Sequence, residues 1–325
     1  MSWLTITCLA VLSGHGSGEE LSLDARTREA IELSVPFIEA KGASWIENKE
    51  CVSCHRVNTM LWSLGAAQAA GISVDSKVNE TFQWAVENSL EVNDDGKMAV
   101  EGNKEGVAQL LLAQKSYFKD LKTEALKEAF RSALTDDITE QGLWSAGGQL
   151  PSQKRPKDET DLVSTYWIAW AATEIGGVDL RKAPLTLLPQ TLAKNTELQS
   201  TEGYAVRLLI AFAFQEQDRV DQVRAKLLEQ QRPDGGWGWL VEGESDALAT
   251  GLALYGLLKT GTEPDHESVS RGQLFLLDSQ REDGSWAVRG TKAKKQDKVA
   301  ETAVYWGTNW AIIALSEILM LKRSP

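Results

Sequence analysis

The chain has 325 residues, of which 42% are hydrophobic, so it can bury a sizeable core. It carries 46 acidic against 34 basic residues, which gives a formal net charge of −12. We expect no nucleic-acid partner, because the sequence offers no basic stripe to contact phosphates, and the same charge disfavours docking to an anionic membrane surface. No internal stretch reaches the roughly 18 to 20 apolar residues that span a bilayer, so we predict no transmembrane span.

The first residues have the order of an export signal. A short apolar run, Trp3–Ser13, is followed by small residues and then by Glu19 and Glu20. We therefore predict a signal peptide over 1–18 and one mature domain over 19–325, in a periplasmic or secreted protein. The run lacks a preceding Lys or Arg, so a disordered terminus, a buried helix start and a lipid anchor on Cys8 are the alternatives.

The next motif is a C-x-x-C-H string at 51–55, the pattern of covalent c-type haem attachment. Two thiols at this spacing can reach the two vinyl groups on one edge of a porphyrin, and the adjacent imidazole reaches the iron from the proximal side. We therefore predict haem c as a cofactor, bound by Cys51, Cys54 and His55. A structural disulfide, a thioredoxin-like redox pair and half of a zinc site are the alternatives, and zinc would need about two more ligands.

The clearest signal in the rest of the chain is an internal repeat. Two segments read Leu-x-x-x-Gln-x-x-x-Gly-x-Trp, and they are residues 227–237 and 276–286. Each is followed by a polar loop and then by an apolar stretch, 246–258 in the first copy and 308–315 in the second. This order predicts a helical hairpin, in which an amphipathic outer helix and a turn precede an apolar inner helix.

Four weaker copies bring the number of hairpins to about six. They lie at 31–64, 82–112, 142–172 and 187–210, and the first of them takes Gly42 and Trp45 as its turn. Runs that alternate β-branched and polar residues are few, so strands are not expected. Because such hairpins cannot bury their apolar faces singly, we predict an all-α protein whose hairpins close into an α/α toroid. An open α-solenoid is the alternative.

The two clear copies resemble the QW repeat of squalene-hopene and oxidosqualene cyclases, and the resemblance is good over 220–320. It implies the α/α toroid of terpenoid cyclases and protein prenyltransferases. It also implies structural roles for the Gln amides, which hydrogen-bond near the turn, and for the indoles that stack there. The residues concerned are Gln231, Gln280, Trp237 and Trp286.

The chain also departs from that family, and the resemblance is only fair over 125–175. Triterpene cyclases have two such barrels in about twice this length, and they carry a D-x-D-D acid motif. The sequence contains no D-x-D-D, and the nearest strings, at 93–95 and 158–161, do not fit. Prenyltransferase β subunits need an Asp, Cys and His set for zinc, and the usable Cys-His set here is the haem motif. The resemblance therefore implies the fold without the cyclisation chemistry.

The repeat alignment also predicts where the haem would lie. Trp45–Thr59 aligns with Trp237–Thr250, which places the haem motif in the loop before the first inner helix, at one mouth of the central cavity. Met98 takes the place of the repeat tryptophan in the neighbouring hairpin and is our candidate for the distal iron ligand. His266 is a weaker candidate, and a five-coordinate haem with an open site is the alternative.

Acidic residues precede other inner helices in the same way. Asp161 and Asp246 are weak candidates for catalytic acids, and with Glu301 and Asp95 they would form an acidic rim at the mouth. The alternative is that they cap the helices, where carboxylates favour the helix dipole. A basic run, Lys292–Lys298, is expected to be a solvated loop, with docking of an acidic redox partner as the alternative.

Together these features favour an exported monohaem c-type protein on a cyclase-like toroid. It would transfer electrons to a partner protein or perform haem-based redox chemistry in the central cavity. The alternative is a squalene or terpenoid cyclase-like enzyme, or an isoprenoid-binding module that holds a hydrophobic small molecule without a redox role. The sequence does not decide whether the chain is an enzyme.

Overall fold

The computed structural model describes residues 21–49, 52, 54–147, 155–180, 185, 188–194, 196–292, 294 and 297–323. At a few of these positions, Cys54 and His55 among them, it describes only the backbone. The predicted signal peptide at 1–18 lies outside the described residues, and so does Cys51.

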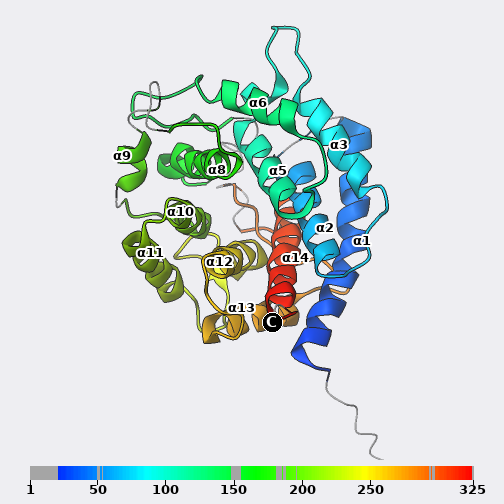
Figure 1. The fold of residues 1–325 in the computed structure, drawn as a ribbon. Coiled ribbons are helices and arrows are strands. Elements are labelled where there is room, and N and C mark those ends of the chain that lie inside the picture. Colours follow the sequence, from blue (N-terminus) through cyan, green and yellow to red (C-terminus); the bar gives the residue numbers. More distant parts are fainter. Residues whose placement is uncertain are drawn as a thin grey trace, which may run out of the picture.

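Six inner helices form the wall of a ring in the described part of the chain. Each packs against the next in chain order, and the last packs back on the first, so the ring is closed (Figure 1). The inner helices are α2 (Thr59–Ala69), α5 (Lys104–Tyr117), α8 (Thr160–Ile175), α10 (Thr201–Ala213), α12 (Ala247–Lys259) and α14 (Glu301–Arg323).

An outer helix precedes each inner helix and covers the ring from outside (Figure 1). The outer helices are α1 (Leu23–Lys49), α3 (Val78–Ser89), α6 (Glu124–Ala133), α9 (Leu188–Ala193), α11 (Gln217–Glu229) and α13 (Glu267–Ser279). The described chain thus forms six hairpins, and the predicted all-α toroid is confirmed. Contact between α14 and α2 excludes the open solenoid.

Short elements occupy the loops before the inner helices. A π-helical turn, η1 (Cys54–Asn58), leads into α2, and a 3₁₀ turn, η2 (Lys157–Glu159), leads into α8. The helix α4 (Ala99–Gly102) precedes α5. The two-residue strands β1 (Trp237–Gly238) and β2 (Ser245–Asp246) pair antiparallel just before α12. These loops carry the candidate site described below.

The inner helices are apolar on nearly every side because each has neighbours on both flanks as well as an outer helix behind it. In α12, for example, every residue from Ala247 to Leu258 is buried. Gly251 lets this helix approach α14 closely, since a Cβ there would lie 2.6 Å from the backbone of Trp310. The core of the molecule is therefore the contact zone between the inner helices.

One described helix, α14, is long and apolar enough to cross a bilayer by length and composition, with a mean hydropathy of 1.3 over its most apolar window. Our expectation that no stretch reaches this limit is wrong for this helix. Of that window, 89% is buried inside the protein. The apolar composition of α14 follows from its place in the closed ring, because this helix packs against α12, α2 and α1.

The turn predicted for the first hairpin at Gly42 and Trp45 is also wrong. Helix α1 runs through both residues to Lys49. Gly42 serves close packing, because a Cβ at this position would lie 1.9 Å from the Sδ atom of Met60 on α2. A glycine in an amphipathic pattern suggests a turn, but here it marks the point where the inner and outer helices touch.

The repeat tryptophans connect the outer and inner helices of three hairpins. Each indole Nε1 donates to the carbonyl of the leucine ten residues earlier, at 2.7 to 3.0 Å. Each backbone N–H donates to a threonine hydroxyl on the inner helix, at 2.9 to 3.3 Å. The Trp, Leu and Thr sets are Trp144, Leu134 and Thr165; Trp237, Leu227 and Thr250; and Trp286, Leu276 and Thr308. The indoles thus form specific hydrogen bonds, beyond the stacking that the resemblance implies.

The repeat glutamines connect neighbouring hairpins, as predicted. Gln231 donates through Nε2 to the carbonyls of Gly235 and Ser268, both at 2.8 Å. Gln280 donates to the carbonyl of Ala30 at 2.8 Å and to that of Gly284 at 3.2 Å. Since Ala30 lies on α1, Gln280 joins the sixth hairpin to the first and closes the outer layer of the ring.

Candidate functional site at the mouth of the toroid

The starts of the inner helices meet at one mouth of the ring, and most of the polar chemistry of the core lies there. In the part of the chain that the structure describes, no group of three or more His, Cys, Asp or Glu residues is arranged to hold a metal ion. The mouth contains three features: the haem motif with its neighbouring Arg56, a buried network around Arg155, and a cavity beside Asp246.

The haem motif lies directly before α2, in the position that the repeat alignment predicts. Its backbone is tied to the second hairpin: Val52 N–H donates to Asn88 Oδ1 of α3 at 3.3 Å, and the Val52 carbonyl accepts from Asn103 Nδ2, just before α5, at 3.0 Å. The π-helical turn of Cys54 and His55 packs against α5, α2, α1 and α14. The thiol and imidazole positions of the motif lie outside what the structure describes.

Arg56 follows the motif and is almost fully buried. Its guanidinium lies between two aromatic rings, 5.1 Å from the centroid of Trp45 and 4.8 Å from that of Tyr305. It also forms a bidentate ion pair with Glu301 at the start of α14, which includes an Nη1–Oε1 bond of 2.9 Å. The predicted rim residue Glu301 therefore anchors the haem motif to the last inner helix.

A second buried arginine joins three inner helices. Arg155 Nη1 donates to Glu105 Oε2 at 2.9 Å, and Arg155 Nε donates to Glu202 Oε2 at 2.7 Å. Ser164 donates to Glu105 at 2.6 Å, and Trp167 Nε1 donates to Glu202 at 3.0 Å. Burial acts to lower the pKa of Arg155, but the two carboxylates raise it well above its usual value. The pairs satisfy charges that would be costly to bury alone.

Neither glutamate of this network is among the predicted site residues, although the sequence contains a signal for both. Glu105 and Glu202 begin the same string, Glu-Gly-x-Ala, in the first turn of two apolar inner helices. A charged residue at the same place in two apolar repeats is unusual, because such residues are rarely buried unless they are paired.

Asp246 and Asp161 occupy equivalent positions and both act as hydrogen-bond acceptors. Asp246 caps α12, accepting from Ala249 N–H at 2.9 Å and from Trp239 N–H at 2.8 Å. Asp161 accepts from Ala146 N–H at 2.8 Å. Burial raises the pKa of Asp246 to about 6. The geometry thus supports the capping interpretation for Asp246, and it gives Asp161 the same task of fixing the loop to its helix.

The remaining candidates lie apart from this mouth or on its edge. Met98 pairs with Val92 in an isolated bridge like that between Ile138 and Trp144, as its place in the repeat predicts. It is half-buried and packs against the core. The exposed His266 caps outer helix α13 by accepting from Ser268 N–H, which fits a loop histidine.

Two other predicted positions can also be placed. Asp95 is exposed in a turn organised by the side chain of Asn93 and does not contribute to an acidic rim. In the basic run Lys292–Lys298, Lys294 and Lys298 are exposed, as expected for a solvated loop, and Lys292 is half-buried.

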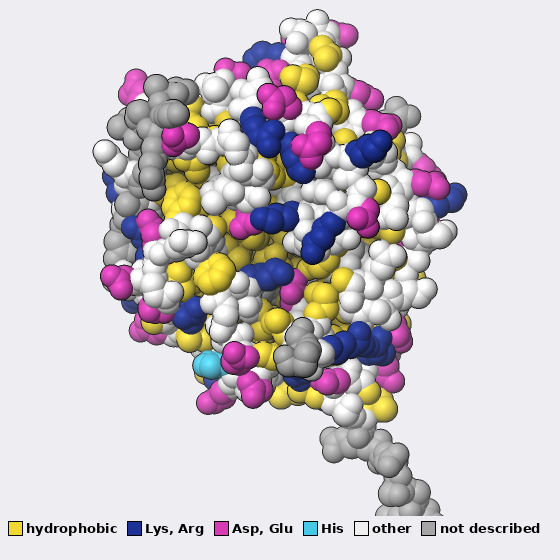
Figure 2. Space-filling view, in the orientation of Figure 1, with side chains coloured by type: hydrophobic (Ala, Val, Ile, Leu, Met, Phe, Trp, Pro, Cys, Tyr) yellow, Lys and Arg dark blue, Asp and Glu magenta, His cyan; other side chains and the backbone are white. Residues whose placement is uncertain are grey.

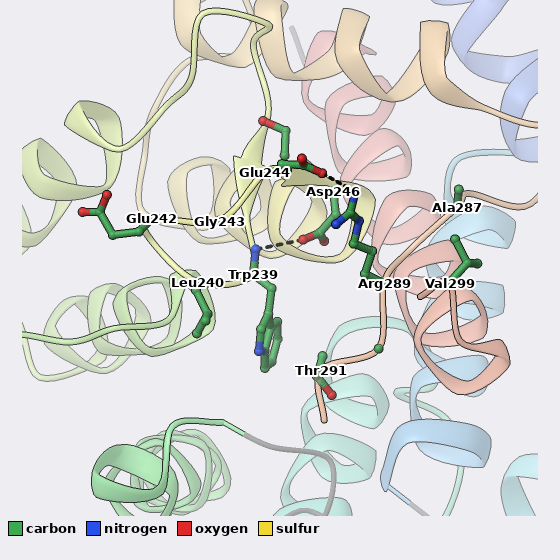
Figure 3. A pocket seen from close by; sticks show the side chains of 12 residues that line it. Trp239, Leu240, Glu242, Gly243, Glu244, Asp246, Ala287, Arg289, Thr291 and Val299 are labelled. Carbon is green, nitrogen blue, oxygen red and sulfur yellow. Dashed lines mark hydrogen bonds and ion pairs between the residues drawn. The ribbon is translucent and has the colours of Figure 1, made fainter. Parts of the chain in front are cut away.

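A cavity of about 630 Å³ opens beside Asp246 (Figure 3). Its walls are the loop before α12 and the two arms of the loop before α14. The lining residues are Trp239, Leu240, Glu242, Gly243, Glu244, Ser245, Asp246, Ala287, Arg289, Gly290, Thr291 and Val299.

The cavity combines an apolar wall with a charged rim. The indole of Trp239 packs against that of Trp306, with ring centroids 5.6 Å apart. On the rim, Arg289 pairs with Glu244 at 2.7 Å, and both side chains are exposed (Figure 3). The volume and the lining are typical of a site for a small organic molecule.

The fold matches solved structures of low sequence identity. One is a variant of the type II terpene cyclase MstE from Scytonema in complex with geranylgeranyl dihydroxybenzoate (TM-score 0.54, 13% identity, covering 92% of this chain and 99% of that one). A second is a protein from Actinoplanes, with a TM-score of 0.57 and 14% identity, covering 91% of this chain and 99% of that one. A third is a glycosidase variant, with a TM-score of 0.58 and 13% identity, covering 94% of this chain and 100% of that one. The chain therefore has a terpene-cyclase-like toroid fold.

One curated relative matches part of the chain. Copalyl diphosphate synthase from Streptomyces anulatus is 35% identical over 79 residues, which are 24% of this chain and 14% of that protein. The chain thus matches only a small part of this relative's length. No family model matches the chain.

Proposed function

We propose that this chain binds a hydrophobic small molecule of the isoprenoid class in the cavity beside Trp239. The observation that carries the proposal is the cavity itself, whose apolar wall of Trp239, Leu240, Ala287 and Val299 opens at the mouth of a terpene-cyclase-like ring. It is supported by the neighbour of the same fold that was solved with a geranylgeranyl compound.

The proposal is binding rather than cyclisation. A cyclase needs an acid that can protonate an alkene, and Asp246 is the buried carboxyl group nearest to the cavity wall. Both of its oxygens already accept backbone N–H bonds from the loop and from the first turn of α12, so Asp246 serves as an anchor of the loop. The chain also lacks the D-x-D-D string.

Equilibrium binding of radiolabelled geranylgeraniol tests the proposal. Val299 is exposed at the edge of the cavity, so Val299→Arg places a charged side chain at its opening without disturbing the core. We expect micromolar binding by the unaltered protein and at least tenfold weaker binding by Val299→Arg. Val92→Arg is the matched control, because Val92 is also exposed on one arm of an isolated bridge. Absence of binding, or equal loss in both variants, would overturn the proposal.

A second proposal is covalent haem c at Cys51 and Cys54, with His55 as the proximal ligand, in an exported protein that exchanges electrons with a partner protein. The residues beside the motif fit such a group. Arg56 Nε and Thr59 Oγ1 are buried without hydrogen-bond partners among the described residues, and both are donors suited to carboxylates such as haem propionates. When bound, the haem would supply one-electron chemistry.

A pyridine haemochrome spectrum tests this second proposal. The protein is expressed together with a c-type haem maturation system and purified under denaturing conditions, so that only covalent haem remains. We expect about one haem per chain, and its loss in the double variant Cys51→Ser/Cys54→Ser. Cys8→Ser is the control and should keep the haem. A colourless protein would contradict covalent attachment.

A further inference from the structure

Five aromatic rings occupy the centre of the barrel. We call Trp62, Trp167, Trp170, Tyr255 and Trp310 the aromatic cluster. Trp62 touches all four others, with ring centroids 5.6 to 6.3 Å apart. The remaining neighbouring pairs lie between 5.6 and 6.4 Å. The rings come from α2, α8, α12 and α14, so they form one connected network of ring contacts through the middle of the barrel.

A buried acid–base pair lies against this cluster, near the other ends of the inner helices. The hydroxyl of Tyr117, in the last turn of α5, donates to Glu317 of α14. Lys259, the last residue of α12, pairs with Glu317 at 3.0 Å, and its ammonium lies 5.7 Å from the ring centroid of Tyr255. Burial, followed by the charge of Glu317, raises the pKa of Tyr117 well above its usual value. Because Lys259 contacts both Glu317 and the ring of Tyr255, the pair adjoins the cluster.

Stability alone does not require this arrangement, because aliphatic side chains could also fill the centre of the barrel and a buried ion pair adds little net stability. Tyr and Trp are the aromatic side chains that lose an electron most readily, and oxidation of a phenol at neutral pH requires a nearby acceptor for its proton. Glu317, which accepts the hydrogen bond of the Tyr117 hydroxyl and pairs with Lys259, is that acceptor.

Apolar side chains also line a hollow on the face shown in Figure 2, with Lys and Arg side chains around it.

We propose that the aromatic cluster conducts an oxidising equivalent through the barrel and that Tyr117 is the residue on which it comes to rest. A one-electron oxidant takes an electron from an indole of the cluster and leaves an indole radical cation. This radical takes an electron from Tyr117, whose phenolic proton passes to Glu317. The products are a neutral tyrosyl radical, a neutral carboxylic acid and the restored indole.

The proposal does not depend on the ligand cavity or on the haem. If the haem is present, its motif is well placed to supply or accept the electron. His55 and Trp62 are seven residues apart along the continuous η1–α2 segment, which corresponds to about 10 Å of helix rise.

Photo-oxidation of the purified chain tests this inference. Ruthenium(III) tris-bipyridine, generated by a flash in the presence of persulfate, is the oxidant, and electron paramagnetic resonance after freezing identifies the radical. The protein carries ring-deuterated tyrosine, so that a tyrosyl signal narrows. We expect mainly a tyrosyl radical in the unaltered protein and mainly an indole radical in Tyr117→Phe. Glu317→Gln removes the proton acceptor and should lower the tyrosyl yield at least several-fold.

Tyr204→Phe is the matched control. Tyr204 also donates to a glutamate, Glu197 at 3.2 Å, but it is not in contact with the aromatic cluster. It should keep the tyrosyl signal. An unchanged tyrosyl signal in Tyr117→Phe, or an indole radical alone in the unaltered protein, would overturn the proposal. Circular dichroism confirms that each variant is folded before the measurement.

Discussion

At the scale of single residues, burial decides which carboxylates have a shifted pKa or need a paired charge. Asp246 is held by two backbone N–H bonds, yet desolvation outweighs them and raises its pKa from 3.8 to about 6. Glu105 and Glu202 are buried more deeply than Asp246, which is half-buried, and they are paired through Arg155. Asp246 could be found from the repeat, and the shared Glu-Gly-x-Ala string marks the two glutamates. Their common partner Arg155 could not be found, because it depends on which helix starts converge in the fold.

The raised pKa of Asp246 predicts a pH-dependent contribution to stability. A carboxyl group whose pKa is higher in the folded state binds protons more tightly when folded, so its stabilising effect is present below pH 3.8 and is lost as the pH rises through about 6. Relative to Asp246→Asn, the unaltered protein should lose about 2 kcal/mol of unfolding free energy between pH 4 and pH 7. Urea unfolding of both proteins at both pH values measures this difference.

Asp283→Asn is the control, with the opposite sign. Hydrogen bonds from Ser285 lower the pKa of Asp283, so the unaltered protein should gain stability relative to this variant as the pH rises. A difference between the unaltered protein and Asp246→Asn that stays constant from pH 4 to pH 7 would show that desolvation of Asp246 is not the dominant effect.

At the scale of elements, the repeat predicted the hairpins best where a copy contains the Gln, the Gly and the Trp of the turn. The Gln amides of 227–237 and 276–286 form the hydrogen bonds near the turn that the resemblance implies. The indoles of Trp237, Trp286 and Trp144 share a hydrogen bond that it does not imply. Prediction failed at Gly42, because a glycine needed for helix packing and a glycine needed for a turn look the same in one sequence. It also missed the use of Arg56, whose partners Trp45 and Glu301 lie far apart in the chain.

Gln280 should contribute more to stability than a surface glutamine, because it joins the last hairpin to the first. Gln280→Ala leaves the carbonyl of Ala30 and the hydroxyl of Ser34 without this donor. We expect a loss of about 1 to 3 kcal/mol in unfolding free energy, measured by urea denaturation. Gln83→Ala, which removes only an exposed contact with Glu87, should change it by less than about 0.5 kcal/mol. Equal effects would contradict a ring closed by Gln280.

At the scale of the whole molecule, the closed ring separates three regions. The mouth where the inner helices begin holds the haem motif and the Trp239 cavity, the centre holds the aromatic cluster, and Tyr117 lies near the ends of the inner helices. The sequence predicted the ring and the mouth, because both follow from the repeat. It could not predict the filled centre, since which indoles meet depends on the packing of four helices.

The most direct test of the account is the place where an isoprenoid ligand binds. A farnesyl probe that carries a benzophenone is photo-crosslinked to the purified protein, and the labelled peptides are identified by mass spectrometry. The account predicts label on residues 237–246 and 287–299, which form the walls of the Trp239 cavity. Label confined to the separate cavity of about 440 Å³ beside Val178 and Phe214 would contradict it.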